Sequence, residues 1–275
     1  MQVRTWLPMA SERTEPSRFF DADDPAHGTM LVQLQPDGAK FQILRRFGYH
    51  DPRHPGEPFI VPANPMTFRT DLASIPWFFA WLVPGLGAHL PAVLLHDGLV
   101  VGLHEGKIHL SPDVDPEEAD RILRDAMASL GTPVIRRWLM WTAVIMATAV
   151  STLRPRWYWP PVVIGTLAAV AGLGMLATLD VVDAWDVLPW MGDRPWTTEL
   201  LLGAAFAVLV PLVLSALWRR LWAAGAIAGI TLALLLHVTA AVCVVYGVYW
   251  LAETVVSGAA ERASPSVNTN LEQAG

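Results

Sequence analysis

Three long stretches without a charged side chain occupy the second half of this chain. They cover residues 157–179, 200–218 and 221–252, and they are 23, 19 and 32 residues long. A helix needs about 20 apolar residues to cross the hydrocarbon core of a bilayer, and the stretches offer that length. We therefore predict an all-α transmembrane domain of three helices over residues 154–252.

The residues before these stretches have a different composition. Over the whole chain 53% of residues are hydrophobic, 16% are charged and the mean hydropathy is +0.38, but most of the proline, histidine and acidic residues precede residue 131. This contrast predicts a soluble domain over residues 28–153. We expect a flexible N-terminal arm at residues 1–27 and a disordered polar tail at residues 253–275, because both segments are polar and lack a sustained period.

The short loops predict the orientation of the membrane domain. Two arginines precede the first stretch, Arg219 and Arg220 separate the second from the third, and the loop at residues 180–194 carries four aspartates and one arginine. Cytoplasmic loops are enriched in Lys and Arg, so we expect a multi-pass protein of a bacterial cytoplasmic membrane, with its N-terminal domain in the cytoplasm and its C-terminus outside. The first 17 residues contain no apolar segment typical of a secretory signal, which favours the same orientation.

One further segment, residues 138–153, has two interpretations. It contains 16 uncharged residues with arginines at both ends and is slightly short for a membrane span. We interpret it as the closing helix of the soluble domain, lying near the membrane interface. A fourth crossing is the alternative.

The soluble domain begins with strand signals. Apolar and polar residues alternate over residues 29–47 on both sides of a Pro-Asp-Gly turn at residues 36–38, which predicts a β-hairpin. Residues 59–63 offer a third strand that ends at proline. We therefore expect a small antiparallel sheet.

Helix signals follow the strands. Residues 90–103 are apolar around His96 and Asp97, and Asp115 offers an N-cap for a helix that ends before Gly131. The soluble domain is thus predicted to be α+β, and the complete chain is an α+β domain followed by the transmembrane helices.

Charge and cysteine content exclude several functions. The net charge is -6 and the chain has only two lysines, so no basic surface is available for a nucleic acid. The single cysteine, Cys243, excludes an intramolecular disulfide and a multi-cysteine zinc site.

Four polar residues from separate segments form a candidate ligand set, namely Asp71, His96, Asp97 and Asp120. One imidazole and three carboxylates can hold a divalent metal, which would activate a water molecule for hydrolysis. The alternative is structural: Asp71 caps a helix, His96 and Asp97 bond to each other or to backbone, and Asp120 pairs with an arginine. No other cofactor is expected.

Five motifs in order carry a family resemblance: TDLASIP from Thr70, LLHDGLV from Leu94, EEADRIL from Glu117, SLGTP from Ser129 and RRWLMWTAV from Arg136. They resemble the phage-associated domain of unknown function 1353 family over about residues 29–150. The resemblance singles out the motif residues Thr70, Asp71, Ser74, Pro76, His96, Asp97, Asp120 and Arg121. It implies a context of phage genomes and phage-tail-like gene clusters, without an established activity.

This chain departs from the family pattern at three positions. Gly98 and Val100 stand where aromatic residues usually follow the His-Asp pair, and Trp77 stands where a basic residue often follows the proline. A pocket built on those aromatic residues is therefore not expected here.

Small residues in the predicted spans favour close helix packing. Gly225 and Gly229 form a GxxxG pattern in the third stretch, which we interpret as packing among the three helices, with a homo-oligomer as the alternative. The stretches contain no charged residue, so a transporter or channel is disfavoured.

Three functions from different classes follow. The first is an accessory protein anchored in the lipid bilayer that recruits a phage-tail-like assembly, of the contractile injection type, or another protein partner. The second is a membrane-tethered metal-dependent hydrolase that uses Asp71, His96, Asp97 and Asp120. The third is a holin-like protein that permeabilises the membrane. We favour the anchor over an enzyme, because the membrane helices are strongly encoded and the catalytic set is not.

Overall fold

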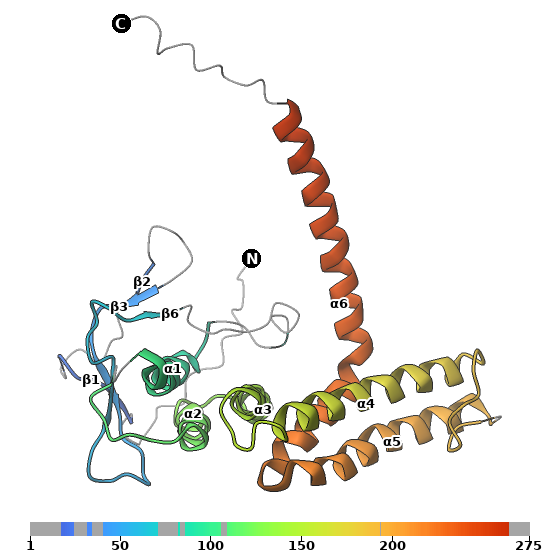
Figure 1. Cartoon of the computed structure of the whole chain (residues 1–275), viewed down its shortest axis with the longest axis horizontal. Helices are drawn as coiled ribbons and strands as arrows, with labels where there is room; N and C mark the ends of the chain where they lie inside the picture. The colour runs from blue at the N-terminus through green and yellow to red at the C-terminus, as the bar shows by residue number, and fades with distance from the viewer. Residues whose placement is uncertain are drawn as a thin grey trace, which may run out of the picture.

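The computed structural model describes residues 18–24, 32–34, 41–70, 82, 86–105, 109–192 and 194–263. Short strands fill the N-terminal part of this region, and helices follow from residue 90 onward (Figure 1). The architecture is an α+β region followed by an α-helical apolar region, as the sequence predicted.

The strands form two antiparallel sheets of three strands each in the described residues. In one sheet β4 (Phe47–Tyr49) lies between β1 (Phe19–Asp21) and β5 (Phe59–Val61). In the other sheet β3 lies in the middle, and its strands are β2 (Val32–Leu34), β3 (Phe41–Ile43) and β6 (Arg69–Thr70).

The predicted hairpin is confirmed as β2 and β3. Val32 pairs with Ile43 and Leu34 with Phe41, and the turn at residues 36–38 lies outside the described residues. The predicted third strand also forms, but it pairs with β4 and not with the hairpin. The described strands therefore form two small antiparallel sheets, where the sequence led us to expect one.

The first strand lies inside the segment that we expected to be a flexible arm. β1 pairs with β4, and the Phe19 ring lies 4.8 Å from the ring of Tyr49. Asp21, which is buried, accepts hydrogen bonds from the backbone N–H groups of Asp23 and Asp24 and from Arg45. An arm over all of residues 1–27 is thus wrong for β1, because aromatic burial holds this short strand.

Three helices follow the strands: α1 (Leu90–Glu105), α2 (Pro116–Ser129) and α3 (Val134–Ser151). α1 packs against β5, α2 packs against α1, and α3 packs against α2. The predicted cap of α2 is confirmed, because the Asp115 carboxylate accepts a 2.9 Å hydrogen bond from the backbone N–H of Glu118. Helix and strand side chains share one core, which includes Ile43, Tyr49, Phe59, Leu94, Leu95, Ile122 and Leu123.

The departure at Gly98 has a packing reason. A Cβ atom at this position would lie 2.0 Å from Cγ1 of Val61, so only glycine lets α1 approach β5 this closely. The close approach occupies space that the family's usual aromatic residues would need.

The apolar region contains α4 (Trp159–Val181), α5 (Trp196–Ser215), a 3₁₀ segment, η2 (Ala216–Leu221), and α6 (Trp222–Ala263). Among the described residues, three helical stretches are long and apolar enough to cross a membrane: Val134–Ser151, Trp159–Val181 and Trp196–Ser257. Arg219, with φ 51° and ψ -121°, interrupts the last stretch and separates α5 from α6. The predicted second and third helices are therefore α5 and α6.

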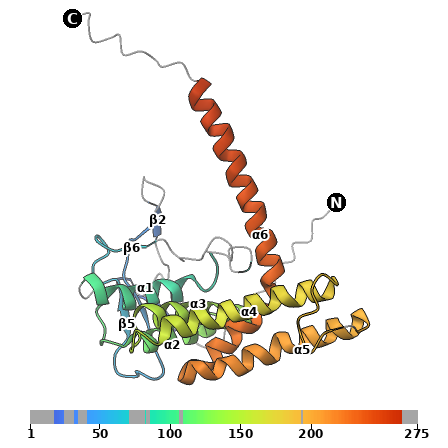
Figure 2. The same ribbon diagram turned by 45° about the vertical axis from the view of Figure 1, so that its right-hand side comes forward.

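The apolar helices do not run parallel over their full length. α4 and α5 lie side by side, whereas α6 begins against them, crosses them and then projects away from the rest of the structure (Figures 1 and 2). At about 1.5 Å per residue, the 42 residues of α6 form a helix longer than a hydrocarbon core of about 30 Å.

Helix α3 belongs to two cores. Met140 and Val144 pack with the strands, α1 and α2, whereas Trp141, Ile145 and Ala149 pack with the beginning of α4 and the η2–α6 junction. The centre of the second core is Trp218, which is fully buried and donates a 3.1 Å hydrogen bond to Thr166 Oγ1. The soluble domain is thus packed directly onto the apolar helices.

Candidate functional site

Two of the predicted site residues meet in the domain core, where α1 faces α2. His96 Nε2 lies 2.8 Å from Asp120 Oδ1. Asp120 is fully buried, and its other oxygen, Oδ2, has no hydrogen-bond partner among the described residues. An ionised carboxylate only accepts, so Nε2 donates to it. A buried acceptor without a hydrogen-bond partner lowers the stability of the folded state, so this pair is a candidate functional site.

A second pair of motif residues, which the sequence did not predict as a pair, lies one residue further along α1. The Thr70 hydroxyl, at the end of β6, donates a 2.9 Å hydrogen bond to Asp97 Oδ2. Thr70 is therefore a hydrogen-bond donor that joins a strand to α1. Asp71, Ser74 and Pro76 lie outside the described residues, so the geometry of the complete proposed set is not described.

Asp120 pairs with His96, and not with an arginine as the structural alternative had it. The neighbouring Arg121 faces a different group of acids. Its guanidinium lies 2.6 Å from Asp51 Oδ2, 2.6 Å from Glu118 Oε1 and 2.8 Å from Asp125 Oδ2. Successive residues on α2 thus serve two separate polar clusters.

The charges of the second cluster reinforce one another. Burial acts to raise the pKa of Asp51, but hydrogen bonds from Arg121 and His54 and their charges outweigh it, and the net pKa is lowered. Burial acts to lower the pKa of Arg121, but its bonds to Glu118, Asp51 and Asp125 raise it. Both groups are therefore held in their charged forms.

The same cluster contains a group with metal-ligand chemistry. Asp51, His54 and Glu118 offer ligand atoms within 4.8 Å of one another, and His54 Nδ1 lies 2.7 Å from Asp51 Oδ2. Arg121 already binds both carboxylates, so an ion-pair cluster describes this group better than a metal centre. In the described part of the chain, His96, Asp97 and Asp120 do not form such a group by themselves.

Sequence reasoning missed Asp51 and His54. Both residues lie in the loop between β4 and β5. Asp51 is 70 residues before Arg121 in the sequence. The signal that could have found them was Arg121 of the EADR motif, to which the sequence assigned no distant partner. A buried arginine requires an acidic partner, and that partner can come from another segment.

The apolar helices also contain buried acids. Asp180 lies in the last turn of α4 and Glu199 in the first turn of α5, and both are nearly fully buried. We had placed Asp180 in the loop between the first two charge-free stretches, and Glu199 directly precedes the second of these stretches. The backbone N–H of Leu188 donates to Asp180 Oδ2 at 3.0 Å, and that of Arg194 donates to Glu199 Oε1 at 3.1 Å.

The predicted packing glycines lie at tight contacts within the chain. A Cβ atom on Gly225 would lie 2.6 Å from Trp218, and one on Gly229 would lie 2.7 Å from the Cβ of Pro211. Both glycines therefore face parts of the same chain.

Polar contacts cross the boundary between the two regions. Arg220 Nε donates to Glu117 Oε1 at 3.0 Å, which joins η2 to the first turn of α2. On the α+β side of this boundary, the Arg124 guanidinium of α2 lies 5.0 Å from the ring centroid of Trp138 and 5.5 Å from that of Trp141, both on α3. These contacts add to the apolar packing around α3.

Comparison with known proteins gave one family. Residues 41–144 match the model of a family described as protein of unknown function (DUF1353). The match begins at β3, ends within α3 and includes both polar clusters. The searches of curated proteins and of solved structures gave no match.

Proposed function

Residues 41–144 match the DUF1353 family, and from this premise we propose that the chain is a membrane-anchored accessory protein that docks a phage-tail-like assembly at the cytoplasmic membrane. The apolar helices insert in the bilayer and hold the DUF1353 domain at its cytoplasmic face, with the C-terminus outside. The resemblance to a phage-associated family supports this class of partner.

The observation that carries the proposal is the double role of α3. Trp141 and Ile145 pack against the apolar helices, whereas Met140 and Val144 of the same helix pack within the DUF1353 domain. A domain that only needed retention at a membrane could hang from a flexible linker. Direct packing instead presents one fixed surface, which suits a docking platform.

The family motifs support a scaffold role. Thr70 binds Asp97, His96 binds Asp120, and Arg121 binds three acids, so each described motif residue has a partner inside the domain. Motif residues that bind one another inside the domain stabilise its fold. In this proposal the partner is bound by other residues, on the surface of the domain.

A flotation assay tests the anchor. The full chain is reconstituted in dye-loaded liposomes and mixed with purified phage-tail-like particles, and the liposomes are floated on a density gradient. We expect particles to float with liposomes that contain the chain and to remain below when the liposomes are empty. Equal distribution would contradict docking, and dye release without particles would favour the holin-like function.

The unpartnered Asp120 Oδ2 favours hydrolysis as the second candidate. This oxygen and the Asp97 carboxylate lie on facing helices, and a bound divalent metal would satisfy the buried acceptor. Elemental analysis of the purified full chain and its His96→Ala variant tests this. Stoichiometric metal that is lost in the variant would support the hydrolase, whereas a metal-free native chain would remove it.

A further inference from the structure

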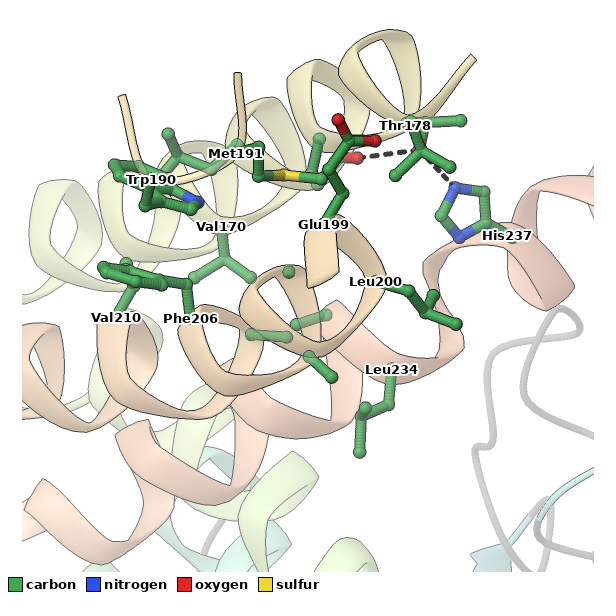
Figure 3. A pocket seen from close by; sticks show the side chains of 18 of the residues that line it. Val170, Thr178, Trp190, Met191, Glu199, Leu200, Phe206, Val210, Leu234 and His237 are labelled. Atoms are coloured by element: carbon green, nitrogen blue, oxygen red, sulfur yellow. Dashed lines mark hydrogen bonds between the residues drawn. The ribbon is translucent and has the colours of Figure 1, made fainter. Parts of the chain in front are cut away.

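A cavity of about 350 Å³ lies between α4, α5 and α6, near the loop that joins α4 to α5 (Figure 3). This volume is in the range of small-molecule sites, about 300–1,000 Å³. Most of its wall is aliphatic or aromatic, and the wall includes Val170, Phe206, Val210 and Leu234. Such a wall suits a hydrocarbon chain.

Three polar side chains interrupt this apolar wall. Glu199 and Thr178 both line the cavity, and His237 of α6 points toward Thr178 (Figure 3). Trp190 and Phe206 stack at the other side of the cavity, with their ring centroids 4.5 Å apart. The cavity therefore has one polar side and an apolar remainder.

The polar side consists of hydrogen-bond acceptors. The Thr178 hydroxyl donates its only hydrogen to the Gly174 carbonyl at 2.8 Å, so the 2.6 Å contact between Thr178 Oγ1 and His237 Nε2 requires Nε2 to be the donor. In the tautomer with its hydrogen on Nε2, His237 Nδ1 is an acceptor, as is the Glu199 carboxylate.

Glu199 carries the charge of the site. It is 3% exposed, and its one hydrogen bond among the described residues comes from the backbone N–H of Arg194 to Oε1. A buried carboxylate needs more compensation than one amide provides. A ligand that brings a positive charge and several N–H donors would supply it.

We propose that this cavity binds a phosphatidylethanolamine molecule of the bilayer, with its ammonium group on Glu199 and one acyl chain along the apolar wall. An ammonium group has three donors for the acceptors at the polar side. Arg194 is exposed, its backbone N–H binds Glu199 and its guanidinium donates to the Met191 carbonyl, and we assign this guanidinium as the cation for the lipid phosphate. The proposal requires the apolar helices to be in a membrane but does not require docking of a phage-tail-like particle.

The lipid head group gives a direct test. Purified full chain is depleted of lipid in detergent and mixed with equal amounts of phosphatidylethanolamine and phosphatidylcholine, and bound lipid is counted by native mass spectrometry. Choline is also cationic but has no N–H donor. We expect a preference of about tenfold for phosphatidylethanolamine, the size of one charge-assisted hydrogen bond. Equal binding of the two lipids would overturn the proposal.

Substitutions locate the lipid. Glu199→Gln keeps the acceptor for the Arg194 N–H but removes the charge, so the preference should fall to within about twofold. Gly203→Leu should lower binding of both lipids, because Gly203 lines the cavity and its side-chain position faces Met191 at 3.5 Å. Gly165→Leu on α4 is the matched control, since its Cβ would meet nothing within 4 Å. An unchanged preference in Glu199→Gln would contradict the assigned site.

Discussion

His96 Nε2 lies 2.8 Å from Asp120 Oδ1, and this hydrogen bond joins the His-Asp motif of α1 to the EADR motif of α2 across the core of the DUF1353 domain. The two motifs are 24 residues apart in the chain. Their pairing explains why a mostly apolar helix contains a histidine and why the amphipathic α2 turns an aspartate inward.

Removal of this histidine should destabilise the domain. His96→Ala leaves the fully buried Asp120 carboxylate without its hydrogen bond from the imidazole, and breaking a buried pair of this kind costs about 3–5 kcal/mol. Thermal denaturation in detergent should show the loss as a lower Tm. His50→Ala is the control, because His50 is exposed and should change the stability by less than about 1 kcal/mol. Similar Tm values for both variants would show that the pair is not structural.

Acid should weaken the cluster around Arg121. The folded-state pKa of Asp51 is below its ordinary value, so the stability from its charge is fully present above the unfolded-state pKa of about 3.9. It is lost as the pH falls through the lower folded-state pKa. Melting curves between pH 7 and pH 2 should show this decline in the native chain.

The matched variant isolates the contribution of Asp51. Asp51→Asn should lose about 3 kcal/mol at neutral pH, because Arg121 loses a buried anionic partner. Its stability should also depend less on pH below pH 5. A profile parallel to that of the native chain would assign the acid sensitivity to other carboxyl groups.

A larger side chain at Gly225 should disrupt the second core. Gly225→Leu would push its Cβ into the ring of Trp218, which is fully buried, and overpacking of this kind costs about 1–3 kcal/mol. Gly247→Leu lies on the same helix but meets nothing within 4 Å, so its Tm should match that of the native chain. Equal effects of the two substitutions would place the Gly225 contact outside the stabilising core.

The proposed orientation can be tested with single cysteines. In a Cys243→Ala background, cysteine at His50 or at Ser266 is treated in intact cells with a membrane-impermeant maleimide. We expect labelling at position 266 and none at position 50, because the arginine-rich loops favour a cytoplasmic DUF1353 domain. Labelling at position 50 without lysis would reverse the orientation.

Local signals were sufficient for some elements of the fold. The Pro-Asp-Gly turn predicted the β2–β3 hairpin, and the Asp115 cap predicted the beginning of α2. Both depend on neighbours within a few residues, where the backbone preferences of each residue act directly. The helix with His96 was also readable, because it is long and apolar.

Long-range pairings could not be read in this way. β1 has three residues, and only its pairing with β4 makes it a strand. The Asp51–Arg121 contact joins residues 70 positions apart, so charge alone does not identify the partner. The cavity at Glu199 was missed for a related reason, because its walls come from three helices that lie far apart in the sequence.

The shared helix α3 changes how the junction between the two regions behaves. Its two faces are already committed, one to the strand-containing core and one to the core around Trp218. The junction therefore contains no flexible hinge at α3. A rotation of α4 or α6 would rotate the DUF1353 domain by the same amount. A particle bound to such a domain would keep one fixed orientation relative to the bilayer plane.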